Sequence, residues 1–355
     1  MIDSNPVVNS DLEHTINYSL PWDFFRNKTV LVTGGEGFLA SFLVKTLLRV
    51  SNMYGLKTKL EVITRYKHSN RSRLREYISD SNLRIFNHDL NMPLPPNFPK
   101  AHIIIHSASQ PTPKYYGTDP VGTLKTNSVG TMYLLDHAVR CHSEKFLFFS
   151  SGEVYGEQSD PNQEFMESQF GYLDPTNVRS AYAESKRMGE TMCVAWRHQF
   201  DIQTLIVRPF HTYGPGMSLN DGRVFADFVA DAVSSRDIVV RSDGLARRPF
   251  CYITDATLGF LTVLMQGESA QAYNIANPKA EVSIGELATI ISQLFPEKRL
   301  GIKFEEPLAS NLYLRSPITR QMPSIEKARS LGWDPVVEIS NGFRRTILSY
   351  GTSKY

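Results

Sequence analysis

Short apolar runs alternate with amphipathic segments from Thr29 to Phe210. The apolar runs are rich in β-branched and aromatic residues, as buried strands are, and they read TVLVTGG, KLEVITR, LRIFNHD, AHIIIHSA, KFLFFSS and QTLIVRPF. Between strands, FLASFLVKTLLRV has apolar residues at helical spacing, and GTMYLLDHAVRC and YAESKRMGETMCVAW are further helical stretches. This alternation predicts an α/β fold with a parallel sheet covered by helices on both faces.

The pattern changes after Phe210. HTYGPGMSLNDGR has the composition of a loop, RSDGLARRPF is basic and turn-rich, and later helices such as SIGELATIISQLF alternate with short strands. We expect a smaller C-terminal α/β lobe that packs over the crevice at the carboxyl ends of the strands. The predicted division is an N-terminal extension over residues 1–27, a sheet domain over 28–210 and the second lobe over 211–355, some of whose segments return to the sheet domain.

The composition is that of an ordinary globular protein. Of 355 residues, 41% are hydrophobic and 21% are charged, and the net charge of +2 gives no bias toward nucleic acid or membrane surfaces. No stretch approaches the roughly eighteen apolar residues of a membrane span, and the polar N-terminus is unlike a signal peptide. Cys141, Cys193 and Cys251 lack metal-binding or disulfide spacing, which predicts reduced thiols in a cytoplasmic protein without a metal site.

The segment TGGEGFLA joins the first strand to the first helix. Gly35, Gly37 and Ala40 fit the pattern G-x-G-x-x-G/A, and with Gly34 in place of Gly35 the residues fit the looser G-x-x-G-x-x-A. Glycines permit a tight turn and let backbone N–H groups approach a pyrophosphate at the helix N-terminus, where the helix dipole favours negative charge. Between a strand and a helix, this loop predicts dinucleotide binding by a Rossmann-type doubly wound sheet.

The second strand ends in Thr64 and Arg65, at the place where an acidic residue would accept from the 2′-hydroxyl of an adenosine ribose. An arginine here can stack on adenine, bind a 2′-phosphate or simply be solvated, so both NAD and NADP stay open as cofactor. Asp89 ends the run LRIFNHD and is placed either to accept from the adenine amino group or to cap a turn.

Polar residues follow the run KFLFFSS, although a buried strand has no structural need for them. Ser151 stands at its tip and Glu153 two residues later, where it can also cap the following turn. Further on, SAYAESK places Tyr182 and Lys186 four residues apart on one helix face, a spacing that solvated pairs also have. An ammonium beside a phenol stabilises phenolate and lowers the pKa of the phenol, which makes a tyrosine usable as a base near neutral pH.

The glycine loop, the Ser-Ser strand tip and the Y-x-x-x-K pair, in this order, resemble the extended short-chain dehydrogenase/reductase family, whose members modify nucleotide sugars. The resemblance covers nearly all of residues 29–350 and includes HSAS, NSVGT, SSGEVYG, YAESK, RPFHTYGPG and RRPFCYITDA. It implies an enzyme that uses NAD or NADP, binds a nucleotide-diphosphate sugar partly through the C-terminal lobe and works as a homodimer.

The resemblance also implies roles for individual residues. The strand-tip hydroxyl of Ser151 hydrogen-bonds the reacting sugar hydroxyl, and Tyr182, next to Lys186, removes its proton while hydride passes to nicotinamide. The positions that match the cofactor side are Gly34, Gly37, Phe38, Leu39, Arg65, Asp89, Leu90, Ala108, Ser109, Asn127, Tyr182, Lys186 and Pro209. The positions that match the substrate side are Gln110, Tyr115, His211, Arg223 and Arg248.

Glu153 bears on which reaction follows. In this family, members that only epimerise commonly have a small or hydroxyl residue there, whereas members that dehydrate or decarboxylate have glutamate before V-Y-G. A C4 ketone makes the C5 proton or C5 carboxylate labile, and a nearby carboxylate can act as base or position the substrate. The segments PTPKYYGTDPVGTLKTN, NDGRV and ITRQMPSIEKARSLGWDP look most like UDP-glucuronate decarboxylases, which make UDP-xylose. Decarboxylation is therefore expected first, before 4,6-dehydration, 4-epimerisation and, as a non-enzyme, a silent NAD-binding regulatory protein.

Two residues depart from the family pattern. Gly152 stands where decarboxylases and many dehydratases have serine or aspartate, so this position supplies no general acid. Loss of water needs a proton donor and loss of carbon dioxide does not, which keeps decarboxylation first. His211 replaces the usual asparagine of R-x-x-N-x-y-G-P near the sugar diphosphate. Both changes favour a substrate or a reaction product that differs from those usual in the family.

The expected dimer would pair two helices from each subunit, as the family usually does. Here these are the helix that ends in DHAVRC and the one that begins at Tyr182. Residues 133–135, with Met188, Met192 and Trp196, give the two helices more apolar surface than one sheet face needs. Ordinary packing against the sheet is the alternative interpretation of the same residues.

Overall fold

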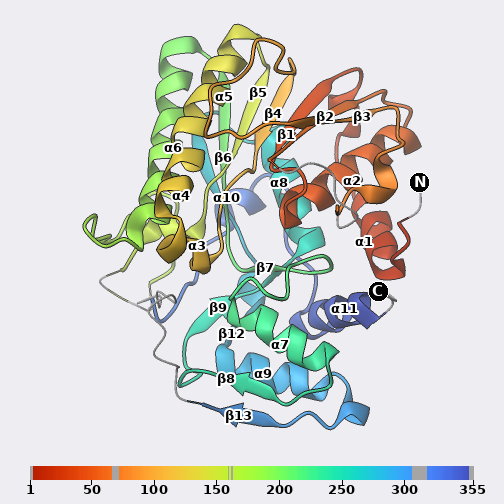
Figure 1. The fold of residues 1–355 in the computed structure, drawn as a ribbon, viewed down its shortest axis with the longest axis vertical. Helices are drawn as coiled ribbons and strands as arrows, with labels where there is room; N and C mark the ends of the chain where they lie inside the picture. Colours follow the sequence, from red (N-terminus) through yellow and green to blue (C-terminus); the bar gives the residue numbers. More distant parts are fainter. Residues whose placement is uncertain (1–2, 66–71, 159, 161–162, 306–317, 352–355) are drawn as a thin grey trace.

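The structure, a computed structural model, describes residues 3–65, 72–158, 160, 163–305 and 318–351 (Figure 1). A seven-stranded sheet runs in the order β11-β6-β5-β4-β1-β2-β3, and all neighbouring strands in it are parallel. Its strands are β1 (Thr29–Thr33), β2 (Lys59–Thr64), β3 (Leu83–Asn87), β4 (Ile103–His106), β5 (Lys145–Phe149), β6 (Gln203–Pro209) and β11 (Gln271–Ile275). The predicted parallel α/β sheet is confirmed, and each of the six apolar runs forms one of its strands.

Helices cover both faces of this sheet (Figure 1). Three that pack together on one side are α4 (Pro120–Asn127), α5 (Val129–Arg140) and α6 (Ser180–Phe200). Three that pack together on the other side are α1 (Pro6–Ile16), α2 (Phe38–Met53) and α8 (Ile253–Gln266). In β1, Val30 and Val32 join the core shared with α2 and α8, whereas Leu31 joins the core shared with α5. Burial on both faces explains why the strands are continuously apolar.

The second lobe consists of short paired strands with helices around them. The pairs are β8 (Ile238–Val240) with β13 (Ile302–Phe304), β9 (Arg247–Pro249) with β12 (Glu281–Ser283), and β7 (Thr212–Tyr213) with β10 (Cys251–Tyr252). The helices of this lobe are α7 (Val224–Val233), α9 (Ile284–Gln293) and α11 (Ile339–Gly351). The remaining short helices are α3 (Pro113–Thr118), α10 (Glu326–Arg329), η1 (Trp22–Phe25), η2 (Arg75–Tyr77), η3 (Gly152–Tyr155), η4 (Pro278–Ala280) and η5 (Pro296–Lys298).

The chain passes between the two regions several times. Helix α8 and strand β11 follow elements of the second lobe in the sequence, yet α8 packs on α2, and β11 pairs with β6 in the central sheet. The N-terminal residues, expected as an extension, include α1, which packs against α2, α8 and α11. In α1, Leu12 and Ile16 are buried four residues apart, and the buried Asp11 carboxylate accepts from the Tyr252 hydroxyl at 2.6 Å. This helix therefore joins the sheet layer to the second lobe.

Several general properties follow from the described part of the chain. Within it, no helix has the length and apolar character to cross a membrane. No three His, Cys, Asp or Glu side chains of these residues are grouped so that they could hold a metal ion. All three cysteines are free thiols.

Candidate active site

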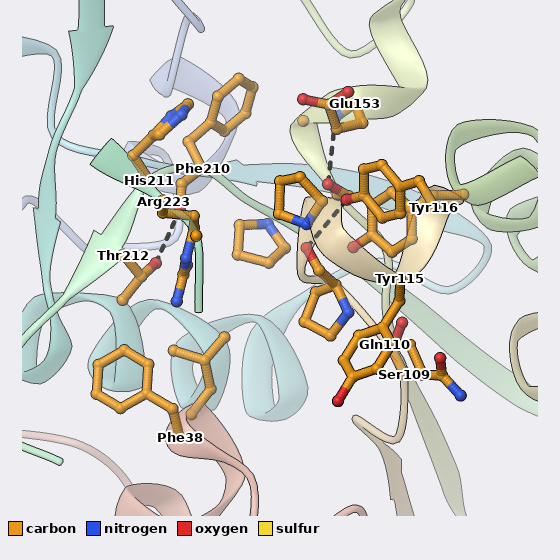
Figure 2. Close-up of a pocket in the computed structure, with 18 of the residues that line it drawn as sticks. Phe38, Ser109, Gln110, Tyr115, Tyr116, Glu153, Phe210, His211, Thr212 and Arg223 are labelled. Atoms are coloured by element: carbon orange, nitrogen blue, oxygen red, sulfur yellow. Dashed lines mark hydrogen bonds between the residues drawn. The ribbon is translucent and has the colours of Figure 1, made fainter. Parts of the chain in front are cut away.

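A cavity of about 1570 Å³ lies where the carboxyl ends of the sheet strands meet the second lobe. Ligands of doubly wound sheets bind in such crevices. Figure 2 shows two opposed walls: one bears Ser109, Gln110, Tyr115 and Tyr116, and the other bears His211, Thr212 and Arg223. The first wall belongs to the sheet domain, and the second is formed by residues that follow β6.

Nearly all predicted site residues meet at this cavity. The predicted cofactor residues that line it are Gly34, Gly37, Phe38, Leu39, Arg65, Asp89, Leu90, Ala108, Ser109, Tyr182 and Pro209. The predicted substrate and catalytic residues that line it are Gln110, Tyr115, Ser151, Glu153, His211, Arg223 and Arg248. The other two, Asn127 and Lys186, are buried near its wall, where Asn127 donates to the Ser185 hydroxyl at 3.0 Å.

The loop between β1 and α2 lets a ligand approach the backbone closely. Gly34 has a φ of +63°, and a Cβ atom on it would lie 2.7 Å from Ala108 Cα, so the position admits no side chain without a shift. Helix α2 begins at Phe38, and its N-cap residue Gly37 makes no side-chain hydrogen bond to the first N–H groups. These features suit a pyrophosphate at the N-terminus of the helix.

The ends of β2 and β3 continue the same wall. Thr64 and Arg65 line it, and neither is acidic. The Asp89 carboxylate accepts from the Asn91 N–H at 3.0 Å and so caps a turn, as one of its two predicted roles required. Asp89 also lines the cavity, and its contact with adenine stays a prediction. The adenosine end of a dinucleotide would thus meet the carboxylate that follows β3 and the cation that follows β2.

Tyr182 and Ser151 reach the cavity from the first turn of α6 and from the end of β5. Burial raises the pKa of the Tyr182 hydroxyl to about 12, and the nearby Ser151 hydroxyl opposes that rise. Lys186 lies one helical turn beyond Tyr182, and its Nζ donates to the carbonyl of Phe149 at 2.7 Å. Burial lowers the pKa of Lys186 to about 7.

The prediction of a lowered pKa for Tyr182 is wrong for this structure, because burial raises that pKa. The Lys186 Nζ is 5.9 Å from the centre of the Tyr182 ring, and it donates to a main-chain carbonyl. Burial disfavours the charged form of each group, phenolate as well as ammonium. Burial is the largest influence on Tyr182, so the pKa of the tyrosine moves up.

Tyr116, which the sequence analysis did not single out, covers Tyr182. The two rings are stacked with centroids 4.9 Å apart and planes inclined by 17°. The Tyr116 hydroxyl donates to the carbonyl of Pro111 at 3.0 Å, which fixes the ring (Figure 2). Successive residues of a helix point about 100° apart, so only one of Tyr115 and Tyr116 can face α6. The sequence contains both tyrosines but does not say which one does.

Glu153 forms an ion pair with Arg179, a residue that the sequence analysis also missed. The Arg179 guanidinium donates to the Glu153 carboxylate at 3.1 Å, and both side chains are largely buried in the cavity wall. The N-cap of η3 is Ser151, whose Oγ accepts from the Glu153 N–H at 3.2 Å, so the Glu153 carboxylate is not the group that caps this turn. Arg179 precedes Tyr182 by three residues, and this helical spacing is the signal that could have revealed it.

The aromatic ring of Phe210 packs directly against Gly152. A Cβ atom on Gly152 would lie 2.6 Å from Cε1 of Phe210, so the ring occupies the space that a side chain would need. The position that lacks a general acid is thus also one where Phe210 leaves no room for a side chain. A serine or aspartate here would require Phe210 to move.

His211 lies in the opposite wall, between aromatic and cationic neighbours. The ring centroids of Phe225 and Phe250 are 6.3 and 5.9 Å from that of His211. Burial, and then the charges of Arg248 and Arg223, lower the pKa of His211 well below its usual value. The imidazole is therefore neutral at physiological pH and offers one donor and one acceptor.

The two predicted substrate arginines are held in place by neighbouring oxygens. Arg248 donates to the carbonyl of Ile318 at 2.6 Å and to that of Thr319 at 3.1 Å. Arg223 donates through Nε to the Asp221 carboxylate at 2.8 Å. Two ordered guanidinium groups beside the cavity provide positive charge for a diphosphate.

Six buried polar atoms find no hydrogen-bond partner among the described residues; two of them, Thr254 Oγ1 and Thr257 Oγ1, lie on α8, and the other four lie in or near the cavity. These four are Ser109 Oγ, Gln110 Oε1, Asn127 Oδ1 and His211 Nδ1. Buried polar groups are nearly always hydrogen-bonded, so we expect polar ligands to complete them. Two lie toward the predicted nicotinamide side and two toward the predicted sugar, which fits a dinucleotide bound beside a sugar nucleotide.

The sequence is similar to curated sugar-nucleotide enzymes over most of its length. Residues 30–276 match the model of the NAD dependent epimerase/dehydratase family. The chain is 35% identical to UDP-glucuronic acid decarboxylase 6 of Arabidopsis thaliana, over 90% of this chain and 88% of the relative. It is 33% identical to UDP-glucuronic acid decarboxylase 1 of Xenopus tropicalis, over 90% of this chain and 71% of that relative.

Solved structures share the fold. One is the UDP-glucuronic acid 4-epimerase of Bacillus cereus in complex with UDP-glucuronic acid and NAD, with a TM-score of 0.76 and 21% identity over 92% of this chain and all of that chain (100%). Another is the dTDP-glucose 4,6-dehydratase of Streptomyces venezuelae with bound NAD, with a TM-score of 0.76 and 22% identity over 92% and 98% of the two chains. With the family match over residues 30–276, this chain belongs to the NAD-dependent epimerase/dehydratase family.

Proposed function

We propose that this protein is an NAD-dependent enzyme that oxidises C4 of a nucleotide-diphosphate sugar and then decarboxylates the sugar at C5, with UDP-glucuronate as substrate. The observation that carries the proposal is the grouping of Tyr182 and Ser151 with the Glu153–Arg179 ion pair in one cavity. The similarity to UDP-glucuronic acid decarboxylases over 90% of the chain supports it independently.

Different residues of the chain would contact the different parts of NAD. The groups that would hold it are the glycine loop and the N-terminus of α2 for the pyrophosphate, Arg65 and Asp89 for the adenosine, and Ser109 toward the nicotinamide, with Lys186 buried behind the cavity wall. When bound, NAD accepts a hydride from C4 of the sugar and can return it in the same turnover. Because Arg65 replaces the usual acid at the end of β2, we keep NADP as the alternative, and titration of both cofactors distinguishes them.

Tyr182 removes the proton of the C4 hydroxyl in this scheme, and Ser151 holds that hydroxyl in place. The Ser151 oxygen accepts from the Glu153 N–H, which orients it toward the cavity. The stacked ring of Tyr116 restricts the Tyr182 side chain and excludes water from one of its faces. Both effects fix the base before the substrate arrives.

Arg179 gives the site a reason to prefer a sugar acid. It lies one turn before Tyr182 on the same side of α6, so it can reach a carboxylate on the ring carbon next to C4. Arg179 is also paired with Glu153. Its positive charge would therefore be divided between two carboxylates, and the charge of the substrate carboxylate would be only partly neutralised. Once C4 is a ketone, the C5–C6 bond can break to release carbon dioxide, and its electron pair moves to the C4 oxygen.

The surroundings of Gly152 favour decarboxylation over dehydration. Water that leaves C6 of a hexose needs a proton donor, whereas carbon dioxide needs none. Gly152 supplies no donor, and Phe210 fills the space beside it. Arg223, Arg248 and the neutral His211 line the opposite wall, where a sugar diphosphate would bind.

The proposal is tested by incubating the purified enzyme and NAD with UDP-glucuronate and, separately, with UDP-, dTDP-, GDP- and CDP-hexoses, and by reading product masses. We expect loss of carbon dioxide from UDP-glucuronate and no change in the neutral sugars. Loss of water from a hexose would identify a 4,6-dehydratase instead. An unchanged mass with inverted stereochemistry would identify an epimerase and would overturn the role given to Glu153.

We also propose that the enzyme is a cytoplasmic homodimer. Three free thiols suit a reducing compartment. On α6, Met188 is 50% exposed and Val194 is 48% exposed, which leaves apolar surface for a second copy. Met192 and Trp196, expected on the same surface, are partly buried against the core of the sheet domain. Leu134 and Leu135, expected to add to this surface, are instead fully buried against the sheet, as the alternative interpretation held. Light scattering at micromolar concentration tests the dimer.

A further inference from the structure

Ser150, the first of the two serines after β5, has no part in the proposed reaction, yet it is buried at 3% exposure. Its hydroxyl donates to Oε1 of Glu190 at 2.5 Å. Glu190 lies one helical turn beyond Lys186 on α6, and Lys186 lies one turn beyond Tyr182. The three side chains therefore follow one another along one face of the helix.

Arg208 of β6 fixes the other side of the Glu190 carboxylate. Its Nε donates to Oε1 at 2.8 Å and its Nη2 to Oε2 at 2.7 Å, in the two-pronged geometry that makes such pairs rigid. Its Nη1 donates to the Tyr155 hydroxyl at 2.8 Å, which in turn donates to Asn274 at 2.7 Å. Three donors thus hold both oxygens of the carboxylate, on a side chain that is 11% exposed.

Lys186 needs a compensating charge where it stands. Its side chain is 2% exposed, and its Nζ donates to the neutral carbonyl of Phe149. An ammonium in such surroundings loses its proton easily unless a negative charge is near. Burial lowers the pKa of Lys186, and the Glu190 carboxylate is the largest influence in the opposite direction.

We propose that Glu190 is a positioning residue for the catalytic pair: its carboxylate, fixed by Ser150 and Arg208 one helical turn from Lys186, keeps the Lys186 ammonium protonated beside Tyr182. The inference rests on the proposed function in that Tyr182 and Lys186 are taken as catalytic. It does not depend on the identity of the sugar.

The other titratable groups around Lys186 do not change charge near neutral pH. Burial lowers the pKa of His106 on β4 to about 3 and raises that of Cys193 on α6 well above its usual value. Burial also raises the pKa of Tyr182 on α6 and of Tyr155 on η3 to about 12. Arg208 stays charged, because its bond to Glu190 outweighs burial and raises its pKa. Lys186 is therefore the group in this cluster that titrates between roughly pH 6 and pH 9.

The first test measures the free energy of unfolding of wild type and Glu190→Gln by urea denaturation across this range, without substrate. The folded-state pKa of Lys186 is below its unfolded value, so the unfolded chain binds more protons in this window and stability rises with pH. Loss of the Glu190 charge lowers the folded-state pKa further. The destabilisation caused by Glu190→Gln should therefore be largest near the acid end of the window and shrink toward the alkaline end.

The second test follows activity against pH. If the protonated Lys186 is required, the alkaline limb of the kcat profile should move to lower pH by about one unit in Glu190→Gln. At mildly alkaline pH kcat should fall about tenfold, while KM changes less than about threefold. Ser150→Ala, which keeps the charge but removes one anchor, should move both measurements in the same direction by less.

Glu184→Gln is the matched control, because Glu184 lies on the same helix, is 37% exposed and pairs with Arg187 at 3.5 Å. It should leave both pH profiles unchanged. A destabilisation by Glu190→Gln that is constant with pH, together with an unshifted alkaline limb, would overturn the proposal and leave Glu190 a packing residue. If Glu190→Gln does not fold, the Ser150→Ala variant decides: an alkaline limb of its kcat profile at the wild-type pH would overturn the proposal. Failure of the substrate assignment would not affect the unfolding measurements, so the two outcomes are distinguishable.

Discussion

The cofactor half of the cavity is formed mainly by main-chain atoms, and the substrate half mainly by side chains. The cofactor half relies on backbone: Gly34 packs against Ala108, and uncapped N–H groups begin α2. The substrate half relies on side chains from separate elements, such as Glu153 after β5 and Arg179 before α6. The cofactor half depends on glycines, which have no side chain. The substrate half depends on charged and aromatic side chains that come from distant parts of the chain. Substitutions in the two halves should therefore fail in different ways.

The largest effect is expected at Tyr182, where the two halves meet. Tyr182→Phe removes the base but keeps the ring that stacks on Tyr116, so folding and NAD binding should stay near wild type. Turnover should fall by roughly 10²–10⁴-fold, the usual contribution of general-base catalysis. Steady-state kinetics and cofactor titration measure both quantities. Turnover near the wild-type value would remove Tyr182 from the mechanism.

A methyl group should be enough to damage the cofactor half. Gly34→Ala places a Cβ 2.7 Å from Ala108 Cα, whereas Gly55→Ala, at a similar φ of +60°, meets nothing within 4 Å. The left-handed backbone costs both variants about 1–2 kcal/mol of stability. We expect only Gly34→Ala to weaken NAD binding, by about tenfold or more. Equal NAD affinity in the two variants, measured by calorimetry, would contradict a backbone-built cofactor site.

Loss of a charge should alter the substrate half selectively. Arg179→Gln removes the partner of Glu153, and a lost hydrogen bond to a charged group is worth about 1.5–3 kcal/mol. We expect kcat/KM for UDP-glucuronate to fall by at least about tenfold, with binding of NAD unchanged. Arg197→Gln, which removes a surface pair with Asp201 on the same helix, is the control. If both variants act alike, Arg179 does not recognise the carboxylate.

The smallest effect concerns the pH dependence of stability. The folded-state pKa of His211 is well below its unfolded value, so below about pH 6.5 the unfolded chain binds a proton that the folded chain does not. Stability should therefore fall as the pH drops through this region, and His211→Asn should make that fall shallower. Urea denaturation at several acid pH values measures the slope. An identical slope in the variant would mean that the imidazole is not held neutral.

The difference between the cofactor half and the substrate half also explains which features the sequence could predict. The glycine loop and the apolar runs are local patterns, so they identified the sheet and the residues at the start of α2. Tyr182 and Lys186 share one helix and were equally visible, but the direction of the pKa shift of Tyr182 depends on burial, which spacing alone does not report.

The missed residues depend on which distant segments meet. Arg179 becomes meaningful only when η3 brings Glu153 within 3.1 Å of it, and Tyr116 only when α3 packs on α6. The burial of α1 was overlooked for a related reason, since its polar residues concealed the four-residue spacing of Leu12 and Ile16. Side-chain sites assembled from several elements need the fold before they can be recognised.

The central claim, a decarboxylation that passes through a C4 ketone, is tested most directly by incubating the enzyme, NAD and UDP-glucuronate in heavy water. Departure of carbon dioxide leaves an electron pair that must be protonated at C5. The account therefore predicts a product that has lost the carboxylate and gained one solvent deuterium at C5, with the ratio of NAD to NADH unchanged if the ketone is reduced again. A product that keeps its carboxylate, with or without deuterium, would contradict it.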